Sequence, residues 1–260
     1  MSAHDLISIA SLYKTYGDPS NGPAVTALED FNLNIRPKEF VAFLGPSGCG
    51  KTTLLKMIGG LISPTSGSIE IGGRPVSGPG DGRALVFQNF ALLPWATVLA
   101  NITFGLELQG VSKQERETEA HRLILAFGLE GFAHSYPRQL SGGMQQRVGL
   151  ARALAVKPEI LLMDEPFSAL DAQTRRMLQE ELLALLDREP KTVVFVTHSM
   201  DEAVRLADRI VLMTPRPGSV KEIIDVPFGH PRAEHFEKDP RYIELIDYLW
   251  DALKGMVWNR

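Results

Sequence analysis

Runs of consecutive apolar residues alternate along the chain with stretches of helical periodicity, and this alternation predicts an α/β domain built around a sheet. Several of the runs are apolar at almost every position, which is typical of parallel strands covered on both faces. The predicted strands are Phe40–Leu44, residues 84–88, Ile160–Asp164, Thr192–Thr197 and Arg209–Met213.

Helix starts are indicated by capping residues. Ser112 with Glu115, and Ser199 with Glu202, have the spacing of a capping box. Asp171 is a potential N-cap before a segment whose apolar residues recur at helical spacing, which predicts an amphipathic helix. The apolar positions of that helix are Met177, Leu178, Leu182, Leu185 and Leu186.

The domain organisation is predicted from where β-like runs are missing. From about residue 89 to residue 155 no such run is clear, so this segment is interpreted as a helical subdomain inserted in a sheet domain that spans residues 1–227. Residues 18–23 form a turn-rich insertion near the amino terminus, and residues 228–260 form a tail that ends in a helix. The apolar positions of that last helix are Ile243, Leu245, Ile246, Leu249 and Leu253.

Composition and charge exclude several classes of protein. The chain has 260 residues with 27 Lys+Arg and 31 Asp+Glu, and its formal net charge of −4 lacks the basic excess of a nucleic-acid-binding protein. The single cysteine, Cys49, cannot form an intrachain disulfide. No apolar run approaches the roughly 20 residues that span a bilayer, and the amino terminus carries no secretory signal. We therefore expect a soluble, cytosolic chain that is not itself a channel.

A glycine-rich segment follows the predicted strand Phe40–Leu44 and opens a helical pattern. It fits the phosphate-binding pattern G-x-x-x-x-G-K-[ST], whose glycines let backbone N–H groups surround an anion at a helix N-terminus. We predict that Lys51 reaches the β and γ phosphates and that Thr52 ligates Mg²⁺, the alternative being a chance glycine-rich turn. Cys49 is interpreted as a small side chain that fills space rather than as a redox group. The segment consists of Gly45, Pro46, Ser47, Gly48, Cys49, Gly50, Lys51 and Thr52, and Thr53 follows it.

The predicted strand Ile160–Asp164 ends at two consecutive carboxylates, Asp164 and Glu165. Because side chains alternate along a strand, the two acids point in different directions. Asp164 suits the coordination sphere of Mg²⁺ through water, and Glu165 is then free to polarise an attacking water as a general base. Taken alone the pair could be a solvated strand end, but together with the phosphate-binding segment the catalytic interpretation is favoured.

A third motif lies shortly before the acidic strand. The residues Leu140-Ser141-Gly142-Gly143-Met144-Gln145-Gln146-Arg147 resemble the signature sequence of ABC-type ATPases, and the rest of that family's pattern occurs in order along nearly the whole chain. Gln88 resembles the glutamine of the Q-loop, residues 168–171 resemble the D-loop, and His198 resembles the switch histidine. Tyr16 is similar to the aromatic residue that stacks on adenine, although Tyr13 is close to it in the chain.

The resemblance implies a P-loop NTPase fold with an inserted helical subdomain, and a composite site for ATP and Mg²⁺. Residues 141–143 would contact the γ-phosphate of the nucleotide held by the other subunit of a homodimer. His198 would contact the γ-phosphate and the attacking water, while Gln88 would contact Mg²⁺ and that water. Asp171 would contact the partner across the dimer interface as well as cap its own helix. Binding of two ATP molecules would close the dimer, and hydrolysis would reopen it.

Each of these residues also has an ordinary structural interpretation. Ser141-Gly142-Gly143 could be only a turn, Gln88 a polar residue that ends a strand, and His198 a histidine at a strand end. Met144 stands where many family members carry Gln, and we interpret it as tolerated there. The ordered combination of motifs favours the functional interpretation in each case.

Shorter motifs resemble one subgroup of importers, the nitrate/sulfonate/taurine type, which is served by extracytoplasmic solute-binding proteins. In that subgroup Asp-Arg often follows the Gly-Pro-Gly turn, whereas here Asp81-Gly82-Arg83 interrupts the pair. The motifs are Gly78-Pro79-Gly80, Leu92-Leu93-Pro94-Trp95 and Pro215-Arg216-Pro217-Gly218.

The resemblance therefore implies uptake of a small anionic solute through two separate transmembrane permease subunits, with the chain bound peripherally at the cytoplasmic face of the inner membrane. Phe90, Leu93 and Trp95 would form a docking patch for these subunits, or else pack in the core of the helical subdomain. One alternative is the ATPase of an exporter or a lipid-extraction system. Another is a clamp protein on DNA or ribosomes, for which the long coiled coil, the second ATPase half and the basic face are missing.

Overall fold

The computed structural model describes residues 5–17, 24–80, 82–233 and 235–258. It divides into two compact units, which we call the terminal unit (Met1–Gly80 and Lys191–Arg260) and the central unit (Asp81–Pro190). The turn-rich insertion predicted at residues 18–23 lies outside the described residues. The tail predicted at residues 228–260 belongs to the terminal unit, while the predicted domain boundaries themselves stay predictions.

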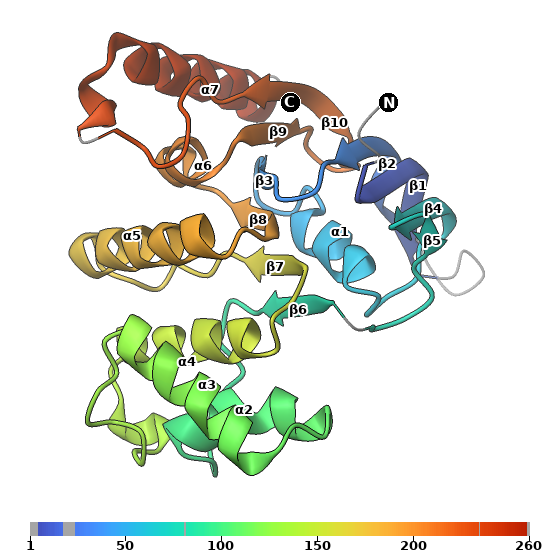
Figure 1. Ribbon diagram of the computed structural model, residues 1–260. Helices are drawn as coiled ribbons and strands as arrows, with labels where there is room; N and C mark the ends of the chain where they lie inside the picture. Colours follow the sequence, from blue (N-terminus) through green and yellow to red (C-terminus); the bar gives the residue numbers. More distant parts are fainter. Residues whose placement is uncertain (1–4, 18–23, 81, 234, 259–260) are drawn as a thin grey trace. The chain divides into compact units, whose positions relative to one another are not determined.

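Parallel strands form the core of the terminal unit (Figure 1). Strand β3 (Phe40–Leu44) lies between β8 (Thr192–Thr197) and β9 (Arg209–Met213) and pairs in parallel with both. All five residues of β3 and all six of β8 are buried, which explains why both read as continuous apolar runs. Strand β10 (Val220–Asp225) pairs with β9 in the antiparallel sense. The bounds predicted for β3, β8 and β9 are those observed.

A second sheet of the terminal unit is antiparallel and four-stranded, in the order β2-β1-β4-β5. Its strand β1 buries one face through residues such as Ile7 and Leu12, while neighbouring positions are exposed or half-buried. Bulges interrupt its pairing with β2 between Ile9 and Thr15, and they blur the period-two pattern on which strand prediction depends. The strands are β1 (Ile7–Tyr16), β2 (Val25–Ile35), β4 (Ser66–Ile71) and β5 (Arg74–Pro75). The helices of the terminal unit are α1 (Lys51–Ile58), α6 (Met200–Leu206), the 3₁₀ turn η2 (Phe236–Lys238) and α7 (Pro240–Trp258).

The central unit combines a parallel strand pair with a set of helices (Figure 1). Strand β6 (Arg83–Val86) pairs in parallel with β7 (Ile160–Asp164). The strand predicted at residues 84–88 is shifted, because Phe90 donates its N–H to the carbonyl of Phe87 and a turn replaces the strand there. Residues 89–155 are all described and contain no strand. Their helices are α2 (Val98–Leu108), α3 (Lys113–Ala126), η1 (Pro137–Gln139) and α4 (Gly142–Ala155), and α5 (Ala172–Arg188) follows β7.

The predicted helix caps are confirmed in two cases and partly wrong in the third. Ser112 forms the complete capping box with Glu115, and Asp171 accepts hydrogen bonds from the first turn of α5. Ser199 accepts the N–H of Glu202, but the Glu202 carboxylate accepts the hydroxyl of Thr197 instead of completing the box.

The amphipathic helix α5 buries the leucines predicted to face the core and exposes one predicted position. Met177 is 48% exposed, because it lies beside the stripe that starts at Leu178 and not within it. In α7, Leu249 is buried and Ile243 is exposed. Among the residues that the structure describes, no helix is long and apolar enough to cross a membrane.

Candidate nucleotide-binding site

The loop that follows β3 has a backbone that only glycine can adopt at its key position. Gly50 has φ 101°, in the left-handed region, and a Cβ there would lie 2.7 Å from Leu28 Cδ2 and 2.8 Å from the Ala27 carbonyl oxygen. Space at Gly45 is also tight, since a Cβ would lie 3.0 Å from the carbonyl oxygen of Met213 on β9. The loop is therefore held tightly between neighbouring strands, with α1 starting directly after Gly50.

Lys51 is buried and its ammonium group lies inside this loop. Nζ donates to the carbonyl oxygens of Gly45 at 2.6 Å and Pro46 at 3.0 Å. A buried ammonium needs such acceptors, and a phosphate oxygen would satisfy it at least as well. Cys49 is also buried, with Sγ 3.7 Å from Lys51 Nζ, so its side chain fills the space under the loop.

The first turn of α1 carries the two threonines of the predicted site. Thr52 is exposed, and Thr53 Oγ1 lies 3.3 Å from the hydroxyl oxygen of Tyr16 at the end of β1. The Tyr16 side chain is 43% exposed, with Lys14 Nζ 5.1 Å from the centre of its ring. Tyr16 thus lies beside the helix that follows the loop, and its role as the aromatic residue that stacks on adenine stays a prediction.

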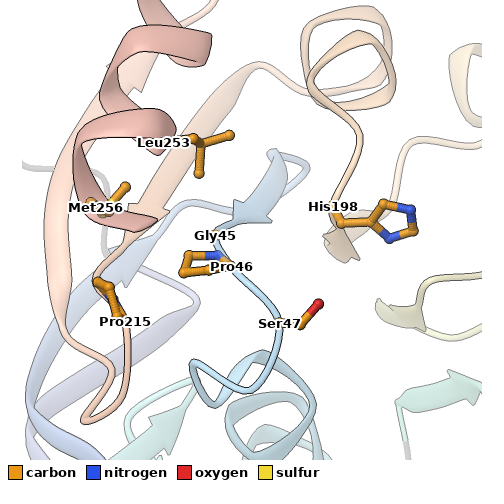
Figure 2. A pocket seen from close by; sticks show the side chains of 7 residues that line it. All are labelled: Gly45, Pro46, Ser47, His198, Pro215, Leu253 and Met256. Atoms are coloured by element: carbon orange, nitrogen blue, oxygen red, sulfur yellow. The ribbon is translucent and has the colours of Figure 1, made fainter. Parts of the chain in front are cut away.

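His198 and the phosphate-binding loop line one cavity of about 450 Å³ in the terminal unit (Figure 2). The register of β3 and β8 explains this, because Leu44 pairs with Thr197 and the two chains leave the sheet at the same edge. The cavity is also lined by three residues, Pro215, Leu253 and Met256, which the sequence did not indicate as site residues. The lining consists of Gly45, Pro46, Ser47, His198, Pro215, Leu253 and Met256.

The turn at residues 215–218 lies against the phosphate-binding loop. A Cβ on Gly218 would lie 1.9 Å from the carbonyl oxygen of Cys49, so only glycine allows this approach. Gly218 also donates its N–H to the carbonyl of Ala27 and accepts from the N–H of Glu29. In the sequence, the Pro-Arg-Pro-Gly motif indicated only a resemblance to one importer subgroup. In the structure it packs against the phosphate-binding loop and supports it. The sequence predicts Leu253 as an apolar position of the last helix. It does not indicate that this side chain lines the cavity beside the phosphate-binding loop.

The central unit brings Gln88 and the acidic turn together. The Gln88 side-chain amide donates to Ser168 Oγ at 3.4 Å, and Ser168 Oγ donates to the carbonyl oxygen of Glu165 at 3.0 Å. Because β6 and β7 are parallel neighbours, the residues that follow both strands lie at the same edge. Asp164 is buried and Glu165 half-buried, with Glu165 at φ 46°. Glu165 is one of eight described residues other than glycine with a positive φ, a conformation that is uncommon for residues with a side chain.

The signature segment forms an exposed helix start. Ser141 caps α4 by accepting the N–H of Met144 at 3.3 Å, and both Ser141 and Gly142 are exposed. A Cβ on Gly143 would lie 2.9 Å from Thr174 Cγ2, so glycine lets this helix start approach the first turn of α5 closely. The N-terminus of α4 is thus exposed at Ser141 and Gly142.

Two residues of α4 hold the loops that carry the polar site residues, and sequence reasoning assigned them no role. Gln146 is buried and donates to the carbonyl oxygen of Pro166, directly after Glu165. The Arg152 guanidinium donates to the carbonyl oxygens of Phe90 at 2.7 Å and Ala91 at 2.8 Å, just after Gln88. Burial lowers the pKa of Arg152. Gln146 lies within the signature run, whereas no sequence pattern pointed to Arg152.

Asp171 is exposed and accepts hydrogen bonds from the backbone N–H groups of Gln173 at 3.1 Å and Thr174 at 3.0 Å. These bonds, above all that from Thr174, lower the pKa of the Asp171 carboxyl group, as expected of an N-cap. Its predicted second contact, across a dimer interface, stays a prediction.

The three apolar residues after Gln88 divide between the two interpretations. Trp95 is 74% exposed, whereas Phe90 and Leu93 are half-buried. Both backbone groups of Leu93 are bound by the buried side chain of Asn101 in α2, which fixes this segment on the helices. Of the predicted docking patch, Trp95 is the most exposed member.

The buried parallel strand, the tight glycine loop and the helix that starts at Lys51 define a P-loop nucleoside triphosphatase. Residues 28–168 match the protein family described as ABC transporter. The chain is 55% identical over 228 residues to the ABC transporter ATP-binding protein MJ0412 of Methanocaldococcus jannaschii, covering 88% of this chain and 83% of that protein. The chain belongs to the ABC transporter ATP-binding family, so the predicted family and fold are confirmed.

Other relatives and solved structures agree with this assignment. A taurine import ATP-binding protein, TauB of Pseudomonas savastanoi pv. phaseolicola, is 49% identical over 233 residues, which cover 88% of this chain and 89% of that protein. The dimeric cassette MJ0796, solved in a post-hydrolysis state bound to ADP and Pi, matches with a TM-score of 0.76 and 36% identity, over 85% of this chain and 98% of that one. The chain is accordingly an ATP-binding subunit and an ATP hydrolase.

Proposed function

We propose that the chain is the ATP-hydrolysing subunit of an importer for a small anionic solute of the taurine, sulfonate or nitrate type. The observation that carries the importer role is the 49% identity to a taurine import ATP-binding protein along 88% of the chain. The organisation that we propose is a sheet domain of residues 1–227, a helical subdomain inserted at about 89–155, and a tail of residues 228–260.

In the proposed reaction, the loop of residues 45–52 binds the phosphates of ATP through its backbone N–H groups and Lys51. Glu165 takes a proton from the attacking water, and His198, which lines the cavity beside Pro46 and Ser47, binds the γ-phosphate and that water. The position of Glu165 supports this role, because it directly follows the buried strand β7, is half-buried, and has its backbone carbonyl bound by Ser168. Tyr16 stacks on the adenine.

Mg²⁺ would be held by Thr52, Gln88 and Asp164, together with phosphate oxygens and water. No group of three or more His, Cys, Asp or Glu side chains among the described residues could hold a metal ion by itself. This fits Mg²⁺, which usually keeps several waters and takes few ligands from the protein when a phosphate is bound. The ion would neutralise charge on the phosphates.

We propose that the chain acts as a homodimer, in which residues 141–143 and Asp171 contact the nucleotide and the loops of the partner. The exposed N-terminus of α4, with Ser141 as its cap, supports this role, because a helix N-terminus interacts favourably with an anion such as a γ-phosphate. The similar cassette MJ0796 is dimeric. Two identical composite sites would follow from the two-fold symmetry.

The remaining partners are two transmembrane permease subunits and, indirectly, an extracytoplasmic solute-binding protein. Trp95, 74% exposed in the segment after Gln88, supports a docking surface for the permease, since large exposed aromatic side chains are enriched at interfaces. The chain would lie at the cytoplasmic face of the plasma membrane.

Purification of the tagged chain from the membranes of its own cells tests this proposal. We expect the chain to co-purify with a multi-span membrane protein, and ATP hydrolysis by the reconstituted complex to rise when the solute-binding protein is loaded with taurine, an alkanesulfonate or nitrate. The Trp95→Ala variant should weaken co-purification, while Leu125→Ala, which also removes an exposed apolar side chain of the central unit, should not. Isolation of the chain without any membrane partner would contradict the importer role.

A further inference from the structure

His198 lies between two residues that are both bound to helix α6. The hydroxyl of Thr197 donates to the Glu202 carboxylate at 2.6 Å, and the N–H of Ser199 donates to Thr197 Oγ1 at 3.0 Å. Glu202 also donates its own N–H to Ser199 Oγ at 3.3 Å. Since Glu202 is buried in α6, the position of α6 sets the backbone on either side of His198.

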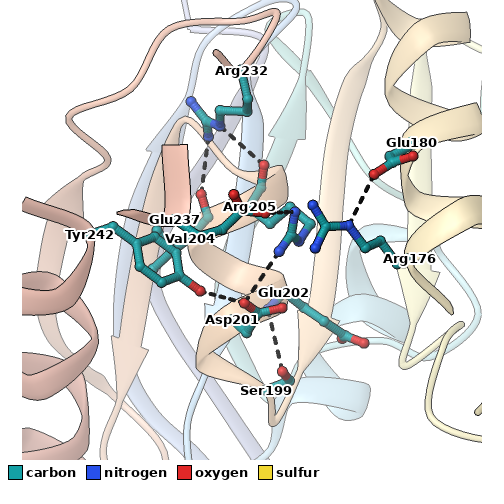
Figure 3. Close-up of polar contacts among 10 residues, drawn as sticks. All are labelled: Arg176, Glu180, Ser199, Asp201, Glu202, Val204, Arg205, Arg232, Glu237 and Tyr242. Carbon is teal, nitrogen blue, oxygen red and sulfur yellow. Dashed lines mark hydrogen bonds and ion pairs between the residues drawn. The ribbon is translucent and has the colours of Figure 1, made fainter. Parts of the chain in front are cut away.

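The first turn of α6 is held by helix α7. The Tyr242 hydroxyl donates to Asp201 Oδ1, as Figure 3 shows. Burial and this bond to Asp201 raise the pKa of Tyr242, so the phenol remains a donor at neutral pH. Its ring packs edge-on against Phe236, with the centroids 5.5 Å apart.

The last turn of α6 is held by the tail through Arg205. Arg205 pairs with Glu237 at 2.7 Å and more loosely with Asp201 at 3.5 Å, and its guanidinium lies 5.4 Å from the centre of the Phe236 ring. The Arg205 side chain is only 9% exposed, so these partners are needed to bury its charge.

Arg232 caps the carboxyl end of α6 from the tail (Figure 3). Its guanidinium donates to the carbonyl oxygens of Arg205 at 3.1 Å, Val204 at 3.3 Å and Ala207 at 2.5 Å. Carbonyls at a helix end lack partners within the helix, and a cation there also interacts favourably with the helix dipole. Burial lowers the pKa of Arg232 to about 10, so the side chain still carries its charge at neutral pH.

Both ends of α6 are thus fixed by residues 232–242, and α6 in turn fixes the segment that carries His198. We propose that Arg232 and Tyr242 are positioning residues for ATP hydrolysis, which act through α6 to hold His198 at the cavity beside the phosphate-binding loop. This inference rests on the role proposed above for His198 at the γ-phosphate.

Steady-state hydrolysis by the purified full-length chain tests the inference. Tyr242→Phe should lower kcat about 3- to 10-fold and Arg232→Met about 10- to 100-fold, with KM for ATP within about twofold, because a misplaced catalytic group slows the reaction while the phosphate-binding loop is untouched. Arg232→Lys should give an intermediate kcat, since an ammonium keeps the charge but cannot reach all three carbonyls.

Two matched variants serve as controls. Tyr248→Phe removes a hydroxyl of the same helix that donates to Glu222 at 2.5 Å, and Arg122→Met removes a guanidinium of the central unit that binds Glu119 at 2.6 Å. Neither group takes part in the bonds to α6 described above, and both variants should keep kcat and KM. If Arg232→Met does not fold, as judged by its thermal unfolding, Tyr242→Phe and Arg232→Lys carry the test.

The same tail variants, made in a His198→Ala background, distinguish an effect of the tail through His198 from an effect that is independent of His198. If the tail acts through His198, Tyr242→Phe will cause no further loss of kcat there. A loss of the same factor in both backgrounds, or a change in KM instead of kcat, would overturn the inference while leaving the role of His198 intact. An unchanged kcat in His198→Ala alone would instead contradict the proposed role of His198.

Discussion

Strands β3 and β7 are alike in structure, and the residues that follow them are opposite in chemistry. Each strand has five residues, each is buried along its whole length, and each pairs in parallel with a neighbour. After β3 come glycines and Lys51, which suit an anion, whereas β7 ends in Asp164 and Glu165, which suit a cation and a water. The same kind of buried strand can therefore lead into a site for an anion or into a site for a cation. The residues at the end of the strand and just after it decide which.

The two strand ends also differ in how their backbone is held. At Gly50 the left-handed conformation depends on the missing Cβ, since Leu28 and Ala27 leave no room for one. At Glu165 a residue with a side chain adopts φ 46°, and hydrogen bonds from the N–H and the hydroxyl of Ser168 to its carbonyl hold it. One loop is thus defined by steric space and the other by hydrogen bonding, which predicts different responses to mutation.

Glu165→Gln should have the largest effect on the reaction. The variant keeps the shape of the side chain but cannot accept a proton, so kcat should fall by roughly 10²- to 10⁴-fold while ATP binding is retained. Glu180→Gln, an exposed change on α5, is the matched control and should keep kcat. Turnover at the original rate in Glu165→Gln would contradict the proposed base.

Lys51→Ala should weaken nucleotide binding rather than the chemical step alone. Loss of one hydrogen bond to a charged group costs about 1.5–3 kcal/mol, which corresponds to a rise in the Kd for ATP of roughly 10- to 100-fold. Calorimetric titration measures this, with Lys56→Ala in the same helix as the control. An unchanged Kd for ATP in Lys51→Ala would contradict the proposal that the loop after β3 binds the nucleotide, while the turn after β7 serves the chemical step.

Gly50→Ala tests whether steric space defines the loop after β3. The variant should lower the free energy of unfolding by about 1–3 kcal/mol, because the added Cβ lies 2.7 Å from Leu28 Cδ2 in a strained conformation. Gly48→Ala has φ 77° but nothing within 4 Å of the added Cβ, so it should cost less. Denaturant unfolding compares the two, and equal losses would contradict the steric explanation.

Ser168→Ala should have the smallest effect and tests the hydrogen-bonded turn after β7. Removal of the hydroxyl that binds the Glu165 carbonyl should cost about 1 kcal/mol of stability and lower kcat a few-fold, because the carboxylate is held less firmly. Ser112→Ala removes the N-cap of α3 and should cost a similar amount of stability with kcat unchanged. An equal kcat in both variants would show that Ser168 does not position Glu165.

Patterns that depend on neighbouring residues in the chain were predicted well. The bounds of β3, β7, β8 and β9 are those expected, because a strand buried on both faces must be apolar throughout. The capping box at Ser112 and the last helix are also confirmed. The end of β6 was misplaced by two residues because the turn at Phe87 carries no glycine or proline to indicate it.

Contacts between distant residues could not be predicted. Gly218 is required because it approaches Cys49, and Arg232 binds carbonyl oxygens of Val204 in α6 and of Ala207 just after it, 28 and 25 residues away. Neither a glycine in a turn nor an arginine in a tail differs in sequence from many others. Trp95 likewise is exposed while Phe90 and Leu93 are half-buried, although all three look alike along the chain.

The amino-acid sequence by itself predicted the family, the bounds of β3, β7, β8 and β9, and the residues that we propose carry the nucleotide chemistry. It could do so because an apolar run, a glycine turn and a lysine at fixed spacing act locally, whatever surrounds them. Only the tertiary structure showed that His198 and the phosphate-binding loop line the same cavity. It also showed that the tail binds helix α6, which begins two residues after His198. Those contacts join residues far apart in the chain, and their partners are chosen by the packing of the sheet and not by sequence spacing.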